Sequence, residues 1–198
     1  MKARSDIAAM IGSRICHDLI SPLGAIGNGV ELLSMTGVAQ SPEMALIAES
    51  VENANARIRF FRIAYGAASE DQTIARAEIA STLAAAARGG RLSYFWEAEG
   101  DQPRNLVRIA FLVLQCLETA MPYGGDIHIR RDGETWEITG EADKLKIDEQ
   151  LWTSLISARK RVAVTPALVQ FMLLPIVAQE SGRVIALKLA PERIVLRF

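Results

Sequence analysis

A histidine and an aspartate stand side by side, His17 and Asp18, within the stretch RICHDLISPLGAIGNGVELL of residues 14–33. Around this pair the stretch has the apolar spacing of an amphipathic helix. An imidazole can act as a nucleophile when one ring nitrogen is free and the other carries a proton that an acceptor holds. Asp18 is the acceptor that the sequence offers. The pair therefore favours nucleophilic chemistry at His17.

Helix geometry predicts which way His17 points. The apolar residues of this helix follow at gaps of three and four: Ile7, Ile11, Ile15, Leu19, Leu23, Ile26, Val30 and Leu33. At about 100° per residue, His17 lies roughly 180° from the centre of that stripe. The same side of the helix carries small or polar side chains, namely Ser13, Ser21, Gly24 and Asn28. This direction disfavours a core histidine, and an ordinary surface histidine remains the alternative to a reactive one.

Three glycines stand within six residues of this helix, Gly24, Gly27 and Gly29. Each costs about 1 kcal/mol against alanine in a helix. Since an ordinary solvated face would carry Lys, Glu and Arg, we expect the glycines to leave room for a large partner. A metal site at His17 is disfavoured because neighbouring side chains on a helix diverge by about 100°. The only other histidine, His128, is interpreted as a structural residue.

The composition of the chain argues against several classes of protein. The 198 residues include 22 Lys and Arg against 23 Asp and Glu, a balance that disfavours nucleic-acid binding through a basic face. The N-terminal residues lack a signal-peptide pattern, and the most apolar stretch, residues 162–178, is short for a membrane span and contains two prolines. Two cysteines far apart argue against a disulfide framework. We expect a cytoplasmic protein with no membrane and no nucleic acid among its partners.

Two long helices are predicted in residues 1–70. The second begins at Ser41-Pro42-Glu43, an N-cap followed by a first-turn proline and acid. Its apolar residues form a heptad seam: Met44, Ile47, Val51, Ala54, Ile58, Phe61 and Tyr65. Helices joined by so short a loop form an antiparallel hairpin, whose apolar stripes must be covered. We favour a second copy of the chain, giving a dimeric four-helix bundle, and the alternative is docking onto the rest of the chain.

Shorter elements are predicted in residues 73–198. Helices are expected near residues 74–87, 105–121, 148–157 and 166–180, and strands near residues 92–97, 127–131, 135–139, 184–189 and 194–198. This order suggests an α/β sandwich, in which helices cover one sheet. The fold class is therefore α+β, with a helical hairpin domain in residues 1–70 and an α/β domain in residues 73–198.

The motif HDLISPL of residues 17–23 resembles the phosphoacceptor box of sensor histidine kinases, which lies in a dimerising helical hairpin. The longer string SRICHDLISPLGAIGNGVELL is similar to the ChpT family of alphaproteobacterial histidine phosphotransferases. The resemblance implies that His17 carries a phosphoryl group. It also implies that residues 73–198 are related to the ATP-binding domain of those kinases.

The boxes that hold nucleotide in such kinases are changed in this chain. Gln115 and Thr119 stand at the two asparagine positions of the N-box, and residues 138–145 lack the D-x-G-x-G pattern. Thr165 and Pro166 stand where phosphate-binding glycines are expected, and proline also removes a backbone donor. The lid is reduced to SARKRVAV, whose basic trio is interpreted as a solvated loop: Arg159, Lys160 and Arg161. We predict a degenerate ATPase-like domain with no cofactor and no metal site of its own.

The resemblance thus implies a phosphorelay. His17 would take phosphate from a receiver aspartate of a hybrid kinase and pass it to receiver domains of cell-cycle response regulators, with Mg²⁺ supplied by the partner receiver. Catalytic roles are predicted for His17, Asp18, Arg14 and Ser21, and partner binding for Ser13, Ile20, Gly24 and Asn28. Arg14 would neutralise phosphoryl oxygens or, equally, form a surface salt bridge. Two alternatives stay open: an ATP-dependent histidine kinase with divergent boxes, and a non-catalytic scaffold that binds receivers.

Overall fold

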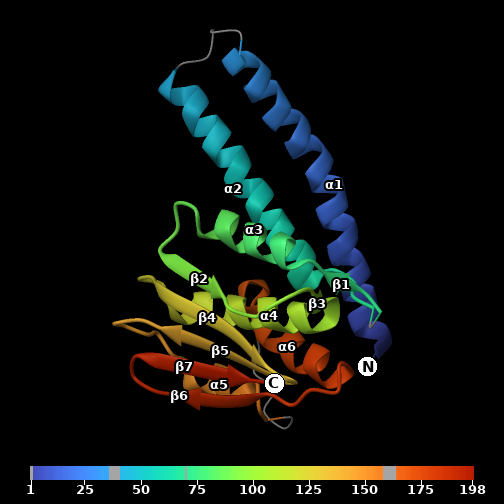
Figure 1. Cartoon of the computed structure of the whole chain (residues 1–198), viewed down its shortest axis with the longest axis vertical. Helices are drawn as coiled ribbons and strands as arrows, with labels where there is room; N and C mark the ends of the chain where they lie inside the picture. The colour runs from blue at the N-terminus through green and yellow to red at the C-terminus, as the bar shows by residue number, and fades with distance from the viewer. Residues whose placement is uncertain (1, 36–40, 70, 158–163) are drawn as a thin grey trace.

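A computed structural model describes residues 2–35, 41–69, 71–157 and 164–198. The chain has a helical hairpin, made of α1 (Lys2–Met35) and α2 (Pro42–Tyr65), that stands on an α/β part made of residues 71–198 (Figure 1). The predicted start of α2 is confirmed, since the Ser41 side chain accepts a hydrogen bond from the Met44 amide at 3.3 Å. The α+β class is confirmed as well.

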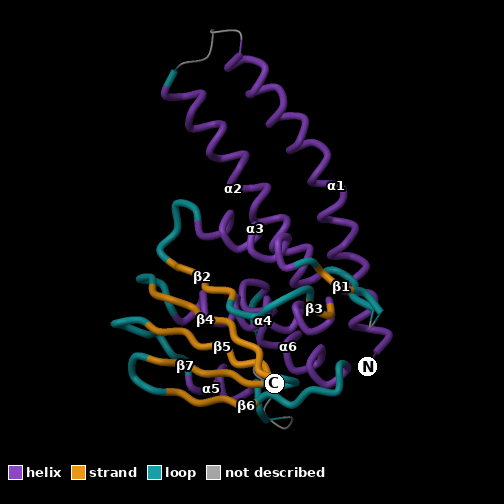
Figure 2. The backbone as a smooth tube through the Cα atoms, viewed as in Figure 1, coloured by secondary structure: helices purple, strands orange, loops and turns teal. Residues whose placement is uncertain are grey.

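The α/β part is a two-layer sandwich, with helices packed on one face of a sheet (Figure 2). Its elements in order are β1 (Thr73–Ile74), α3 (Arg76–Ala87), β2 (Leu92–Trp96), β3 (Gln102–Pro103), α4 (Arg104–Ala120), β4 (Gly125–Asp132), β5 (Thr135–Glu141), α5 (Glu149–Ser154), a 3-10 turn (Pro166–Leu168), α6 (Val169–Glu180), β6 (Ala186–Leu189) and β7 (Arg193–Arg197). The strand order is β2-β4-β5-β7-β6, in which β2 and β4 run parallel and the other neighbours antiparallel. Alternate residues such as Ile127 and Ile129 face the helices and are fully buried.

The predicted elements are present, and several of their ends differ from the expected bounds by a few residues. The helix expected from residue 74 begins at Arg76, because residues 73–74 pair with residues 102–103 as two short strands. Strands of two residues are too short to show a periodicity. The helix expected over 166–180 opens with a 3-10 turn, and the helix expected over 148–157 ends at Ser154.

The C-terminal half of α2 belongs to the core of the α/β part. Phe60, Ile63 and Ala64 are at most 1% exposed, and the Phe60 and Phe111 ring centroids lie 4.7 Å apart. The end of α2 therefore docks onto the rest of the chain, which the sequence left as the alternative, but through residues that the predicted heptad seam did not include. The two parts share one core, and the boundary near residue 70 remains a prediction.

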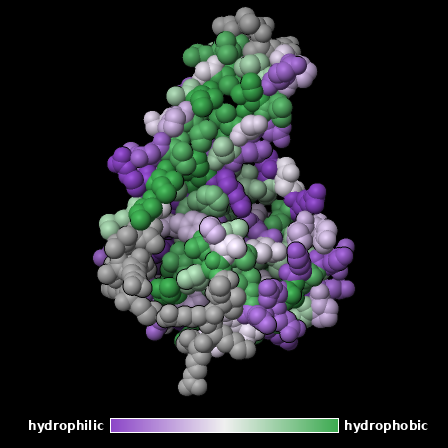
Figure 3. All heavy atoms as spheres, turned by 180° about the vertical axis from the view of Figure 1, so that it is seen from behind, coloured by the Kyte–Doolittle hydropathy of each residue, from purple (hydrophilic) through white to green (hydrophobic). Residues whose placement is uncertain are grey.

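Most of the apolar stripe of α1 is exposed among the residues that the structure describes, although Val30 is buried. Five of its residues are between 45% and 54% exposed: Ile11, Ile15, Leu19, Ile26 and Leu33. Seen from behind, hydrophobic side chains gather along the hairpin (Figure 3). A contiguous apolar surface of this kind marks an interaction site in most proteins.

Small residues bring α1 and α2 together. A Cβ atom on Gly12 would lie 3.1 Å from the Tyr65 carbonyl oxygen, and one on Gly27 would lie 3.4 Å from Val51 Cγ1. The prediction that Gly27 leaves room for a partner was therefore wrong, since Gly27 serves the contact inside the hairpin. Gly24 and Gly29 have open space where a Cβ would stand, as expected.

Candidate functional site

His17 lies on the exposed side of α1, and its side chain is 82% accessible. Its Nδ1 lies 3.2 Å from Asp18 Oδ1, while Arg14 Nε donates to Asp18 Oδ2 at 2.7 Å. Arg14 and Asp18 are one helical turn apart, the spacing at which side chains meet on a helix. The Asp18 carboxylate thus joins all three residues, which we call the His17 trio.

The hydrogen bonds of the trio keep the Asp18 carboxylate ionised. Hydrogen bonds from His17 and then from Arg14 lower the pKa of Asp18 below its usual value, so the carboxylate stays ionised at neutral pH. An ionised carboxylate can only accept, so its hydrogen bond to His17 requires a proton on Nδ1. In the neutral ring Nε2 then has the free lone pair. The exposed nitrogen is the nucleophilic one.

Most of the other predicted residues are accessible. Ser21, Asn28 and Ile20 are exposed on α1, and Gly24 is half-buried with open space beyond its Cα. Arg14 forms the surface salt bridge that the sequence left as one of its two readings.

Ser13 does not belong with these residues. Its hydroxyl accepts a hydrogen bond from the Ala67 amide at 3.1 Å, and its side chain lies beside Gly66. Ser13 therefore holds the segment after α2 against α1, and its role in partner binding remains a prediction. A helical projection could not show this, because Ala67 lies 54 residues further along the chain.

The residues at the altered nucleotide boxes bind one another. Gln115 and Gln170 are each 5% exposed. Tyr65 donates its hydroxyl hydrogen to Gln115 Oε1, and Gln170 Nε2 donates to Thr119 Oγ1 at 3.1 Å. Side chains of α2, α4 and α6 thus fill the space between these helices. The basic trio of residues 159–161 lies outside the described residues.

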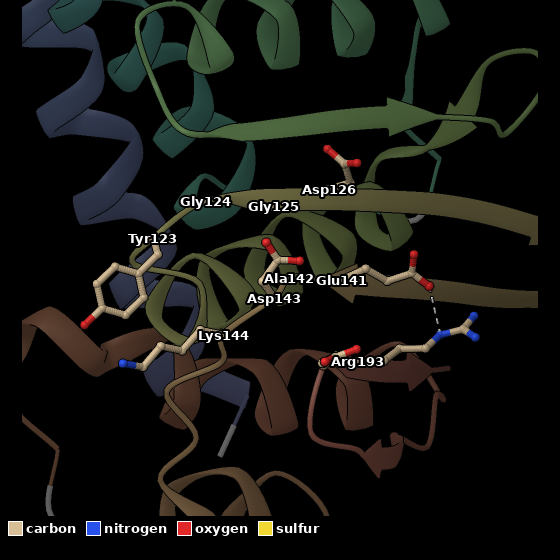
Figure 4. Close-up of a pocket in the computed structure, with 10 residues that line it drawn as sticks. Tyr123, Gly124, Gly125, Asp126, Glu141, Ala142, Asp143, Lys144 and Arg193 are labelled. Carbon is tan, nitrogen blue, oxygen red and sulfur yellow. Dashed lines mark ion pairs between the residues drawn. The ribbon is translucent and has the colours of Figure 1, made fainter.

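A cavity of about 560 Å³ opens at one end of the sheet (Figure 4). It is lined by residues of the α/β part alone, so it is separate from the His17 trio. Three of its charged groups have partners, since Arg193 Nε lies 3.2 Å from Glu141 Oε1 and the Lys144 ammonium lies 5.2 Å from the Tyr123 ring centroid. Within the described residues, no group of three His, Cys, Asp or Glu side chains could hold a metal ion. No helix in the same ranges has the length and apolarity that a membrane span requires.

Residues 76–193 match the family described as the histidine phosphotransferase C-terminal domain. The chain is also 34% identical, over 196 residues, to the protein phosphotransferase ChpT of Brucella abortus (strain 2308), covering 96% of this chain and 93% of that protein. The chain belongs to the ChpT family of histidine phosphotransferases. The predicted membership is therefore confirmed.

Solved structures agree with this family. A bacterial phosphotransferase determined at 1.7 Å superposes with a TM-score of 0.71 at 32% identity, over 97% of this chain and 95% of that chain. A histidine kinase domain from Erythrobacter litoralis EL346 aligns over 96% of this chain and 91% of its own, with 16% identity and a TM-score of 0.47. The hairpin and the α/β part are thus both present in the phosphotransferase relative.

Proposed function

We propose that this chain is a phosphorelay histidine phosphotransferase, in which His17 carries a phosphoryl group between receiver domains. The observation that carries the proposal is the exposed imidazole whose Nδ1 faces the Asp18 carboxylate, in a chain of this family. His17 Nε2 attacks the phosphorus of a receiver aspartyl phosphate. The bond from phosphorus to the carboxylate oxygen breaks, and its electron pair returns to the receiver aspartate. The second receiver reverses these steps.

The Asp18 carboxylate stabilises the phosphorylated ring. Phosphorylation of Nε2 leaves an imidazolium whose proton stays on Nδ1 and is hydrogen-bonded to the Asp18 carboxylate, so the positive charge faces a negative one. Arg14 brings positive charge to the same side of α1, where it offsets the charge of the phosphoryl oxygens. Ser21 adds a polar group one turn further on. Phosphoryl transfer depends mainly on such positioning and charge neutralisation.

Partner and cofactor assignments belong to the same proposal. Ile20, Gly24 and Asn28 form the surface that a receiver meets beside His17, and the α1 stripe pairs with a second copy in a four-helix bundle. The receivers belong to a hybrid kinase and to cell-cycle response regulators, and they supply the Mg²⁺. Transfer takes place in the cytoplasm, with no nucleic acid or membrane as a partner.

Independence from ATP is supported by the packing between α4 and α6. Gln115 Oε1 accepts from Tyr65, Thr119 Oγ1 accepts from Gln170 Nε2, and Gln170 Nε2 also donates to the Gln115 carbonyl oxygen, so these atoms already have partners within the protein. An ATP-dependent kinase with divergent boxes would need that space. A receiver-binding scaffold without catalysis would have no use for the ordered Nδ1 contact of His17.

Two incubations of the full chain test the proposal. A receiver domain of a hybrid kinase, phosphorylated with a labelled phosphoryl group, is expected to label the chain in an acid-labile and alkali-stable form. Labelled ATP with Mg²⁺ alone is expected to leave it unlabelled. Labelling by ATP alone would establish the kinase alternative, and labelling in neither incubation would establish the scaffold.

Replacing Asp18 with asparagine is expected to slow transfer. The variant keeps the size of the side chain but loses the charge that faces the imidazolium, and because the pair is exposed we expect a loss of about tenfold. The measurement is the transfer rate at saturating phosphorylated receiver. Asp71→Asn, at another exposed position, is the matched control and should transfer at the rate of the unmodified chain. An unchanged rate in Asp18→Asn would contradict the role given to the carboxylate.

A further inference from the structure

One carboxylate joins the hairpin to two elements of the α/β part. Arg57 on α2 makes two hydrogen bonds to Glu118 on α4, Nη1 to Oε1 at 3.2 Å and Nη2 to Oε2 at 2.7 Å. Tyr94 on β2 donates its hydroxyl hydrogen to Glu118 Oε1 at 2.8 Å. The Glu118 side chain is only 15% exposed. We call Arg57, Glu118 and Tyr94 the junction cluster.

The surroundings keep the cluster in its bonded form. The Arg57 guanidinium lies over the rings of Phe60 and Phe61, 5.6 and 5.2 Å from their centroids. Burial alone would lower the pKa of Arg57, but its hydrogen bonds and charge pairing with Glu118 raise it overall. Burial, reinforced by the Glu118 charge, raises the pKa of the Tyr94 phenol. Arg57 stays charged and Tyr94 stays protonated near neutral pH.

Arginines of α4 hold the end of α2 close to the cluster. Arg104 donates to the carbonyl oxygens of Ala67 and Arg62 at 3.3 and 3.4 Å, and Arg108 donates to that of Ala64 at 3.4 Å. Carbonyl groups at the end of a helix lack partners within the helix, and cations are favoured there. The hairpin is thus held through its last turn as well as through Arg57.

Packing alone does not set the angle of this joint. The apolar contact of Phe60 with Phe111 is non-directional, whereas a bidentate guanidinium–carboxylate pair has a fixed plane and spacing. Tyr94 donates a third hydrogen bond to the same carboxylate, at Oε1. An α2 helix that rolled or tilted on α4 would break both Arg57 bonds and leave the largely buried Glu118 charge with only the neutral Tyr94 hydroxyl as a partner.

We propose that the junction cluster is a latch that holds the α/β part at one angle to the hairpin that carries His17, and that receiver docking requires this angle. The proposal rests on the function proposed above. Among the described residues, the hydrogen bonds and ion pairs of the His17 trio run only within the trio. The latch therefore acts on the binding of the partner, and the chemical step at His17 does not depend on it.

The angle is measured with spin labels, a method that involves no phosphate. One label is placed on α2 through Ala45→Cys and one at the exposed end of β4 through Asp132→Cys. Labelled chains are diluted with excess unlabelled chains, so that distances within one chain dominate. Chains with a single added cysteine report any labelling of the buried thiols of Cys16 and Cys116. We expect one narrow distance distribution for the unmodified latch and a broad one for Glu118→Gln.

Docking is measured as the Kd for the unphosphorylated receiver domain used above, separately from the transfer rate at saturation. Glu118→Gln is expected to raise the Kd about fivefold and to leave the saturated transfer rate within about twofold. Glu52→Gln is the matched control, because it removes a glutamate that pairs with Arg88 between α2 and the end of α3 but whose side chain is 63% exposed to solvent. That control should change neither quantity.

A second variant separates the latch from loss of folding. Arg57→Met combined with Glu118→Gln leaves neither charge unpaired, and a cooperative melting transition checks that it is folded. It should broaden the distance distribution as Glu118→Gln does. A narrow distribution in both variants, or an unchanged Kd, would overturn the latch. Receiver binding without any transfer in the unmodified chain would refute the proposed function, while the distance distributions would still decide the latch.

Discussion

Replacing His17 with alanine is expected to abolish labelling by a phosphorylated receiver, with a loss of at least about 1000-fold in transfer rate. The reason is that the variant removes the atom that forms the new bond to phosphorus. The neighbouring Arg14 cannot substitute for it, since its guanidinium is a permanent cation with no free lone pair to attack phosphorus. The measurement is the labelling of the full chain over time, followed by acid and alkali treatment of the labelled protein.

His128→Ala is the matched control for this variant. His128 also pairs with a carboxylate, Glu97 Oε1 at 2.7 Å, and stacks on Phe95 with ring centroids 4.6 Å apart. Unlike His17, it lies on the open face of the sheet, and its Nδ1 contact serves a surface ion pair that includes Arg130. The control should be labelled at the normal rate. Normal labelling of His17→Ala, or loss of labelling in His128→Ala, would place the phosphoryl group elsewhere.

The His17 trio was predictable from the sequence because it is local. Arg14, His17 and Asp18 lie within five consecutive positions of one helix, so helical geometry alone brings them to one side. The structure adds which partner each side chain takes. In the sequence Arg14 could serve a phosphoryl group or a salt bridge, and the observed bond to Asp18 is the salt bridge.

The contact between α1 and α2 could be predicted only in part. The large apolar residues of α1 point to its exposed stripe, whereas the side that meets α2 carries small residues such as Gly12, Cys16 and Gly27. A count of large apolar residues therefore identifies the stripe and misses the helix contact beside it. The assignment of Gly27 went wrong for this reason.

The local sequence does not predict the junction cluster. Arg57, Tyr94 and Glu118 come from three elements. Arg57 and Glu118, which form the salt bridge, are 61 positions apart in the sequence. A charged residue on a helix normally indicates a solvated face. Only the docking of α2 on α4, which buries Phe60, turns Arg57 toward a carboxylate. Long-range pairing of this kind depends on topology, which no periodicity encodes.

Replacing both Ile15 and Leu19 with arginine is expected to convert a dimeric chain into a monomer. These residues are 54% and 45% exposed in the single chain and belong to the exposed apolar stripe of α1. In a four-helix bundle they would face the same stripe of a second copy, where unpaired guanidinium groups are strongly unfavourable. The measurement is molar mass in solution by light scattering or sedimentation, with twice the chain mass expected for the unmodified protein.

Val184→Arg is the control for this loss of association. Val184 is 85% exposed but lies before β6, away from the hairpin, so a positive charge there should leave the mass at two chains. Both variants should keep the circular dichroism of the unmodified α/β part, because its core contains neither the stripe nor Val184. A monomeric unmodified chain would contradict the bundle, and so would a double variant that remains dimeric. The stripe lies on α1 opposite to His17, so pairing through it leaves the imidazole of each copy open to a receiver.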